Sequence, residues 1–167
     1  MNKNTYLTYN YRIMYGFISD KMYYSKLSNG KFLIRLEIGE KVNESIKYFC
    51  EKQKIQGAWF SCIGSIKNPT LYHYKAATKK YTNTELEGVF EVTSLLGNVA
   101  LFEGKPIVHA HVSISNEMMQ AFGGHLVEAE IAAMLEIMLQ DFDVKLIKKL
   151  DAATGLKVFN LGKHLSQ

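Results

Sequence analysis

Three of the five histidines fall within one short stretch, HAHVSISNEMMQAFGGH, residues 109–125. His109 and His111 flank a single alanine, and His125 follows a glycine pair. Imidazole nitrogens are common ligands of zinc and other transition metals, which they bind at about 2.0–2.1 Å. These residue types predict a three-imidazole metal site. The alternative is that the three are ordinary polar side chains of a β protein, and the spacing alone leaves it open.

The HxH spacing has a clear consequence on an extended backbone. Side chains alternate between the two faces of a strand, so His109 and His111 point the same way with their β-carbons about 7 Å apart. Ala110 then faces the opposite side, where a small residue fits any packing. A turn followed by Gly123–Gly124 can return His125 to the pair, because glycines permit positive φ and close backbone approach.

A site with three protein ligands leaves coordination positions open, which is typical of catalytic or substrate-binding metals rather than structural ones. Zinc is the first expectation for nitrogen ligands, with nickel, copper or iron as alternatives. A water bound there would be acidified and could act as a nucleophile. Glu128, Glu91 and Glu130 are available as a general base or as partners of the ligands, with Glu128 and Glu91 as the candidate bases. The remaining histidines have other roles: we predict His73 to be structural and His164 to be exposed.

The elements that must position these residues follow from hydrophobic periodicity. Residues 31–39 alternate as a strand, and residues 40–57 change to helical spacing, with Gly57 as the C-terminal cap. Residues 58–66 have the composition of a buried strand, and 71–85 that of a strand, a turn and a strand. Further predicted elements are an antiparallel meander over 88–115, with turns at Gly97–Asn98 and Glu103–Gly104, and a hairpin over 144–162.

Residues 125–142, HLVEAEIAAMLEIMLQDF, are the ambiguous segment. Alanine, leucine, methionine and glutamate favour a helix, and an apolar stripe recurs at helical spacing. The start of the segment also permits a strand. On local composition alone we predict a helix here.

Composition limits the class of protein. The chain has 167 residues, the size of one domain, with a tyrosine-rich N-terminal extension over residues 1–28 expected to pack on a body spanning 29–167. Cys50 and Cys62 show no CxxC spacing and are expected in the core, which favours a reducing compartment. The N-terminus lacks a signal-peptide pattern, and no apolar run approaches the roughly 20 residues of a membrane span, so we predict a cytoplasmic protein.

The basic residues bear on nucleic-acid binding. The net charge is +4, and all but two of the 20 basic residues are lysines, the exceptions being Arg12 and Arg35. Readers of base edges rely on arginine forks. The lysine pairs Lys79–Lys80 and Lys148–Lys149 are expected on a solvated surface, so that any DNA contact is weak and non-specific.

The ordered run RLEIGEKVNESIKYF, GAWFSCIGSI, EGVFEVTSLLGN, KPIVHAHVSIS and AFGGHLVEAEI resembles the plants-and-prokaryotes conserved domain, PPC, which occurs beside AT-hooks in plant nuclear proteins. The resemblance covers about residues 30–150. It implies an α/β fold of the α+β type, with a mostly antiparallel sheet wrapped around one main helix, and a homotrimer. It also implies a metal on His109, His111 and His125, and a strand rather than a helix after Gly124. The chain carries no RGRP-type AT-hook, so the DNA-binding role of the plant proteins transfers poorly.

Two functions from different classes follow. The first is a metal-carrying homotrimeric binding module that contacts a partner protein or a small ligand, with a DNA-associated regulatory role as its extension. The alternative is a small metal-dependent enzyme, a hydrolase or lyase, in which metal-bound water attacks and a glutamate serves as base. A carboxylate within hydrogen-bond reach of the histidine site would favour the enzyme.

Overall fold

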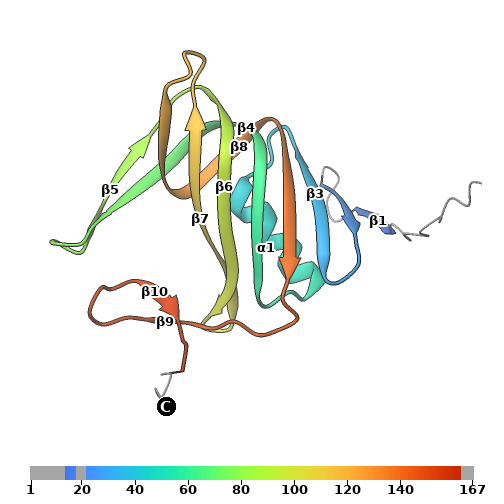
Figure 1. Cartoon of the computed structure of the whole chain (residues 1–167). Coiled ribbons are helices and arrows are strands. Elements are labelled where there is room, and N and C mark those ends of the chain that lie inside the picture. The colour runs from blue at the N-terminus through green and yellow to red at the C-terminus, as the bar shows by residue number, and fades with distance from the viewer. Residues whose placement is uncertain (1–13, 18–21, 163–167) are drawn as a thin grey trace, which may run out of the picture.

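The computed structural model describes residues 14–17 and 22–162. Within them the chain forms one helix, an eight-stranded sheet and a two-stranded ribbon (Figure 1). The helix α1 spans Val42–Gln53. The strands are β1 (Met14–Phe17), β2 (Tyr23–Lys26), β3 (Lys31–Glu37), β4 (Ala58–Lys75), β5 (Lys80–Glu85), β6 (Val89–Phe102), β7 (Lys105–Ser115), β8 (Ala121–Asp141), β9 (Lys148–Leu150) and β10 (Lys157–Phe159).

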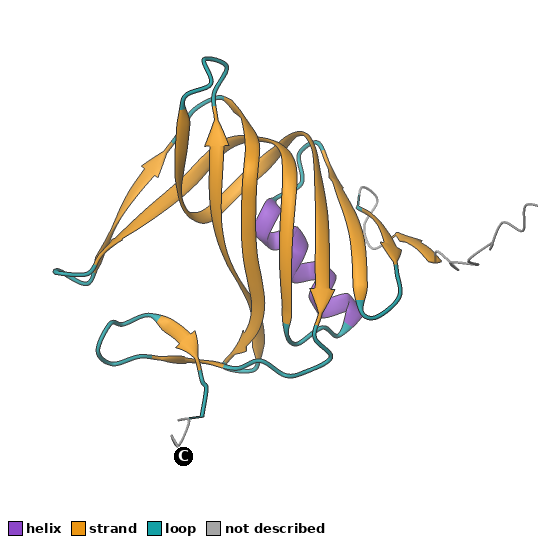
Figure 2. Cartoon of the chain, in the orientation of Figure 1, coloured by secondary structure: helices purple, strands orange, loops and turns teal. Residues whose placement is uncertain are grey.

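The large sheet is antiparallel throughout, in the order β1-β2-β3-β8-β7-β6-β4-β5, with an additional pairing between β8 and β4. Strand β8 is the centre of this arrangement. Its first residues pair with β7, and its last residues lie between β3 and β4. The sheet curves strongly around α1, which lies on its concave side (Figure 2).

One face of the sheet packs against α1 and forms the core. The register places Phe32, Leu139, Phe60, Gly97 and Ala110 in one row across five strands, and all five are buried. Helix α1 covers this face with its own apolar stripe, which consists of Val42, Ile46, Phe49 and Cys50. The alternation of strand side chains thus fills one side of the sheet completely.

The sheet and the helix confirm most of the predicted elements. Over 125–142 the helix that local composition favoured is wrong, and the strand that the resemblance implied after Gly124 is confirmed. This segment forms most of β8, where Leu135, Ile137 and Leu139 are buried while Glu136 and Met138 are exposed. That period of two fits a strand between β3 and β4. Tertiary pairing on both sides therefore overrides the local helix propensity.

Two predicted glycine roles are also corrected. Helix α1 ends at Lys54, which adopts the left-handed conformation itself with φ 60°, so Gly57 is not the cap. Gly97 does not form a turn but lies within β6, where the ring of Phe60 occupies the space that a β-carbon would need. The turn predicted at Glu103–Gly104 is present, and both residues have positive φ.

The remaining predictions concern the N-terminal extension, the cysteines and membrane-spanning helices. Most of the predicted N-terminal extension, and His164, lie outside the described residues, while β1 and β2 add two strands to the edge of the sheet beside β3. Cys50 and Cys62 are free and buried, as predicted. Among the residues with assigned positions, no helix has the length and apolar character required to cross a membrane.

Candidate metal centre

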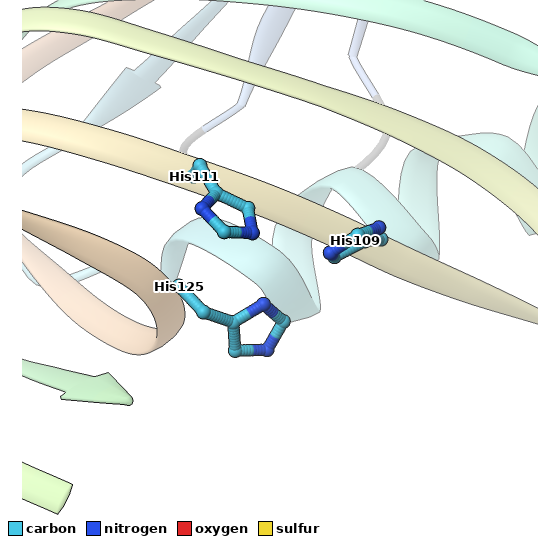
Figure 3. Close-up of side chains that lie close together, drawn as sticks. All are labelled: His109, His111 and His125. Atoms are coloured by element: carbon cyan, nitrogen blue, oxygen red, sulfur yellow. The ribbon is translucent and has the colours of Figure 1, made fainter. Parts of the chain in front are cut away.

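His109, His111 and His125 come together on the face of the sheet opposite α1 (Figure 3). One potential ligand atom from each lies within 4.8 Å of those of the other two. The ring centroids are 5.2 Å apart for His109–His111, 5.2 Å for His109–His125 and 5.4 Å for His111–His125. The three rings therefore surround one point, although they come from two strands.

Strand register explains this convergence. His109 and His111 lie on the same face of β7, and the intervening Ala110 is buried in the core. His111 is directly opposite His125 in the pairing of β7 with β8. Cross-strand neighbours of this kind have β-carbons about 4.5–5.5 Å apart. The antiparallel hairpin thus completes the triad that the HxH pair begins.

The glycine pair before His125 acts through close approach rather than through positive φ. Gly123 and Gly124 are part of the extended strand β8, and the positive φ values of the described residues occur elsewhere. A β-carbon on Gly123 would lie 2.9 Å from the carbonyl oxygen of Val112 on β7, and one on Gly124 would lie 3.1 Å from that of Tyr72 on β4. The glycines allow β8 to pack tightly between its two neighbours at this point.

The environment lowers the pKa of two of the three imidazoles, those of His109 and His125. His109 and His125 are half-buried, whereas His111 is exposed. Burial, then the charge of Lys148, then the other two histidines lower the pKa of His109 to about 4. Burial, His111 and Lys148 lower the pKa of His125 in the same direction. Only neutral imidazole can ligate a metal, so these lowered values favour metal binding near neutral pH.

The donor set fits a transition metal. Three nitrogens bound at 2.0–2.1 Å to one ion lie about 3–3.5 Å apart. The ligand atoms here lie within 4.8 Å of one another, close to that spacing. A hydrogen-bond acceptor lies beside the histidines. Asn98 is opposite His109 in the register, and its side-chain oxygen is buried without a hydrogen-bond donor among the described residues. Metal-ligating imidazoles usually donate their second N–H to such an acceptor.

Two tyrosines border the site, and neither was among the residues predicted for it. The rings of Tyr72 and Tyr81 lie 6.4 Å and 6.5 Å from that of His125. Lys148, on β9, is only 5% exposed and corrects the expectation that the pair Lys148–Lys149 is solvated. The signal in the sequence for this burial was a lysine within an otherwise apolar strand pattern. The residues around it do not indicate where the hairpin packs against the rest of the chain.

Glu128, a candidate base, and Glu130, the third available carboxylate, have other partners. The carboxylate of Glu128 accepts hydrogen bonds from the backbone N–H groups of Asn43 and Glu44 at the start of α1, at 2.9 and 3.1 Å. Glu130 forms an ion pair with Lys67 at 2.7 Å. The structure therefore directs both carboxylates to partners outside the histidine cluster.

Glu91 and His73 are also separate from the cluster. Glu91 shares the histidine face but lies opposite Ser115, four residues beyond His111, which is about 13 Å along an extended strand. His73 is exposed on β4, opposite Thr82 on β5. Neither residue joins the three imidazoles in the group that could hold a metal.

These features define a class: a protein whose described residues form one helix, a curved antiparallel sheet and a cluster of three histidines. The comparisons with known proteins agree with that class. The sequence profile of the Plants and Prokaryotes Conserved (PCC) domain, the family abbreviated PPC above, matches residues 23–143. The chain belongs to this family. No match to a curated protein was found.

Solved structures support the same assignment. A plant- and prokaryote-conserved protein from Pyrococcus horikoshii is 36% identical, covers 90% of this chain and 96% of its own, and superposes with a TM-score of 0.74. A metal-containing protein from Archaeoglobus fulgidus is 27% identical, with coverages of 89% and 96% and a TM-score of 0.73. A candidate DNA-binding protein from Ralstonia eutropha is 26% identical, with coverages of 83% and 96% and a TM-score of 0.77.

Proposed function

We propose that this protein binds a divalent transition metal, with zinc as the first expectation, through His109, His111 and His125, within a homotrimeric interaction module. The observation that carries the proposal is the approach of three imidazole ligand atoms to within 4.8 Å of one another. The lowered pKa values of His109 and His125 support it, because the apo site needs little deprotonation to accept an ion. The metal-containing relative from Archaeoglobus fulgidus supports it independently.

Self-association is supported by the open face of the sheet. Leu33, Ile63 and Met138 are 43%, 60% and 56% exposed and line one hollow on this face. Trp59 and Leu96, on the same face by register, are 46% and 47% exposed. An apolar patch of this kind on a soluble domain marks an interaction site. A second and third copy of the chain are the partners we propose for it.

A DNA-associated regulatory role is proposed only as weak, non-specific contact. The candidate DNA-binding relative supports the association, and the net charge of +4 is compatible with it. Arg35 is poorly suited to reading bases, because its guanidinium pairs with Glu37 at 2.6 Å and lies over the ring of Tyr23. The expected contact is therefore between lysines and phosphates.

A small metal-dependent hydrolase or lyase remains the alternative, since a three-ligand site leaves positions open for a substrate. The hydrogen bonds of Glu128 to the start of α1 weigh against its use as a base. We therefore place ligand binding ahead of catalysis. Cytoplasmic localisation is part of the proposal and is supported by the two free, buried cysteines.

Metal content tests the proposal directly. Purified protein is stripped with a chelator, incubated with zinc, desalted and measured by elemental analysis. We expect wild type to retain about one ion per chain and His111→Ala to retain a small fraction of that, because two imidazoles hold zinc far more weakly than three. His73→Ala is the matched control, since it removes an exposed histidine from the same sheet. Equal zinc content in His111→Ala and wild type would overturn the proposal.

A further inference from the structure

Asn98 on β6 has a buried side-chain oxygen that no donor among the described residues reaches. The residue is 9% exposed, although its neighbours on the same face of the sheet, Trp59 and Leu96, are 46% and 47% exposed. A buried acceptor without a donor is unfavourable, because it has lost its contact with water and gained no partner in exchange. Such exceptions are rare in folded proteins, and each requires a physical explanation.

The comparison with Asn43, whose side-chain oxygen is also buried without a donor, shows what a structural explanation looks like. The side-chain amide of Asn43 donates to the carbonyls of Leu126 and Val127 at 3.1 and 2.9 Å. The contact between the start of α1 and β8 therefore sets the orientation of this side chain. The surroundings of Asn98 are different, because its neighbour across the strands is a histidine of the cluster.

Strand register places Asn98 beside that histidine. Asn98 lies directly opposite His109 in the pairing of β6 with β7. The adjacent pair, Gly97 and Ala110, is buried on the face that packs against α1, so Asn98 and His109 both project from the other face. Directly opposite residues have β-carbons about 4.5–5.5 Å apart. The amide of Asn98 and the imidazole of His109 are therefore side by side.

The other two imidazoles have different neighbours across the strands. His111 lies opposite Leu96 on β6 and opposite His125 on β8, and His125 also lies opposite Tyr72 on β4. A leucine side chain cannot accept a hydrogen bond, and the ring of Tyr72 has its centroid 6.4 Å from that of His125. Among the strand pairings of the described residues, Asn98 is thus the side-chain amide that faces a member of the cluster.

The covalent structure of the two side chains indicates which ring nitrogen faces the amide. The Oδ1 atom of asparagine and the Nδ1 atom of histidine are both bonded to Cγ, so both lie two bonds beyond the β-carbon. The two atoms therefore lie at a similar height above the sheet, whereas Nε2 is one bond farther out. A hydrogen bond from one ring nitrogen determines which nitrogen is left for a metal. An Nδ1–H that donates to Asn98 leaves Nε2 of His109 available to the ion.

We propose that Asn98 is a positioning residue of the histidine cluster, whose side-chain oxygen accepts a hydrogen bond from Nδ1–H of His109 and leaves Nε2 as the metal ligand. This inference rests on the proposed metal site, since Asn98 acts through one of its ligands. It goes further by naming the ligating nitrogen and the residue that selects it. The same bond gives the buried oxygen of Asn98 a donor, so the burial of this side chain serves the site rather than the fold.

Zinc affinity and stability should respond differently to loss of the acceptor. Zinc affinity is measured by competition with a chromophoric chelator, and thermal unfolding of the chelator-stripped protein is followed by circular dichroism. Asn98→Leu keeps a side chain of similar size and should weaken zinc binding by about 10–100-fold. Its melting temperature without zinc should stay the same or rise, because the variant no longer buries an unpaired oxygen.

Two further variants separate this role from a structural one. Asn98→Asp keeps an oxygen at the same position and should retain the zinc affinity of wild type, since carboxylates are common partners of ligating histidines. Asn43→Leu is the matched control, because it makes the same substitution at another buried asparagine. It should lower the melting temperature through the loss of two hydrogen bonds to β8 and leave zinc affinity unchanged.

The wild-type protein provides a spectroscopic test that needs no variant to fold. In zinc-loaded protein with isotope-labelled histidine, long-range proton–nitrogen spectra distinguish a protonated ring nitrogen from a metal-bound one. We expect His109 to have its proton on Nδ1 and the metal on Nε2. The Nδ1 proton should exchange slowly with water in wild type, because it is bonded to a buried oxygen, and faster in Asn98→Leu.

The possible failures are distinguishable. Wild-type protein that retains no zinc contradicts the proposed metal site itself. Equal zinc affinity in wild type and Asn98→Leu, or a proton on Nε2 of His109 in the zinc-loaded wild type, overturns the role of Asn98 alone. A loss of zinc affinity in Asn98→Leu that comes with a lower melting temperature, and that Asn98→Asp does not restore, also overturns it, because this result assigns Asn98 to the fold.

Discussion

The two faces of the sheet are built from alternating residues of the same strands, yet they have opposite environments. Phe60 on β4 is fully buried beneath α1, whereas its neighbour Trp59 is 46% exposed on the other face. The same contrast separates Ala110 from His109 and His111 on β7. One face is closed by a helix that belongs to this chain. The other exposes apolar side chains and imidazoles, among them Trp59, Leu96 and His111.

This difference separates stability from function within single strands. The residues facing α1 supply the apolar burial on which folding depends. The residues facing away contribute less to the fold of one chain, and they carry both the proposed metal site and the proposed contact with other copies. Substitutions at two neighbouring positions of one strand should therefore have very different consequences, because one position faces α1 and the other faces away from it.

The largest expected effect comes from the neighbouring pair on β4. Phe60→Ala should lower the free energy of unfolding by about 3–5 kcal/mol, because it leaves a cavity in a closed core. Trp59→Ala should lower it by less than about 1 kcal/mol in dilute protein, where assembly contributes little. Urea unfolding followed by circular dichroism measures both. Comparable losses for the two variants would show that the faces do not differ in the way that their exposure indicates.

The closed face could be predicted well from the sequence, because alternation and local periodicity determine it. Phe32, Ile34 and Leu36 were assigned to one face of a strand and are buried there, although Ile38 lies beyond the end of β3 and is 58% exposed. Helix α1 was recognised from its apolar stripe. Strand β8 was missed by composition because its neighbours in the sheet, which are distant in sequence, decide its conformation.

The site on the open face was only partly predictable, for the same physical reason. The HxH spacing fixes the common orientation of His109 and His111, which needs no long-range information. The register that brings His125 opposite His111 depends on the length of a turn, and the position of Lys148 depends on a hairpin bound to β4 and β6. Glu128 was expected as a base beside the histidines. Its carboxylate instead accepts a hydrogen bond from the backbone N–H of Asn43 at the start of α1, a residue distant in sequence.

The next largest effect concerns assembly. Ile63→Glu places a charge in the exposed apolar hollow and should weaken self-association by far more than tenfold while leaving the fold intact, because an unpaired carboxylate would be buried between copies. Sedimentation velocity should show a trimer for wild type and a monomer for the variant. Leu150→Glu is the control, since Leu150 is equally exposed at 61% but lies on the ribbon. A monomeric wild-type protein would remove the proposed role of the open face.

A smaller effect is expected from the pH dependence of the metal-free protein. The pKa of His109 is about 4 in the folded chain and near its usual value of about 6.5 in the unfolded chain. The unfolded state therefore binds more protons between these values, and the free energy of unfolding should fall as pH falls from about 6.5 to about 4. We expect a loss of roughly 1–2 kcal/mol after allowing for partial exposure. His109→Gln should reduce this slope in urea titrations at several pH values, and an unchanged slope would contradict the lowered pKa.

The smallest effect is expected from Lys148, and its sign is opposite to that of the core variants. Burial, and then the charge of Lys157, lower the pKa of Lys148, so the charged side chain opposes folding in the metal-free protein. Lys148→Met should therefore raise the free energy of unfolding by about 1 kcal/mol at neutral pH, and by less at high pH, where wild-type Lys148 is neutral in both states. Thermal unfolding of this variant beside Lys149→Met measures the difference. A gain in stability is the result expected when a buried charge opposes folding, whereas a loss of stability would mean that Lys148 serves the fold.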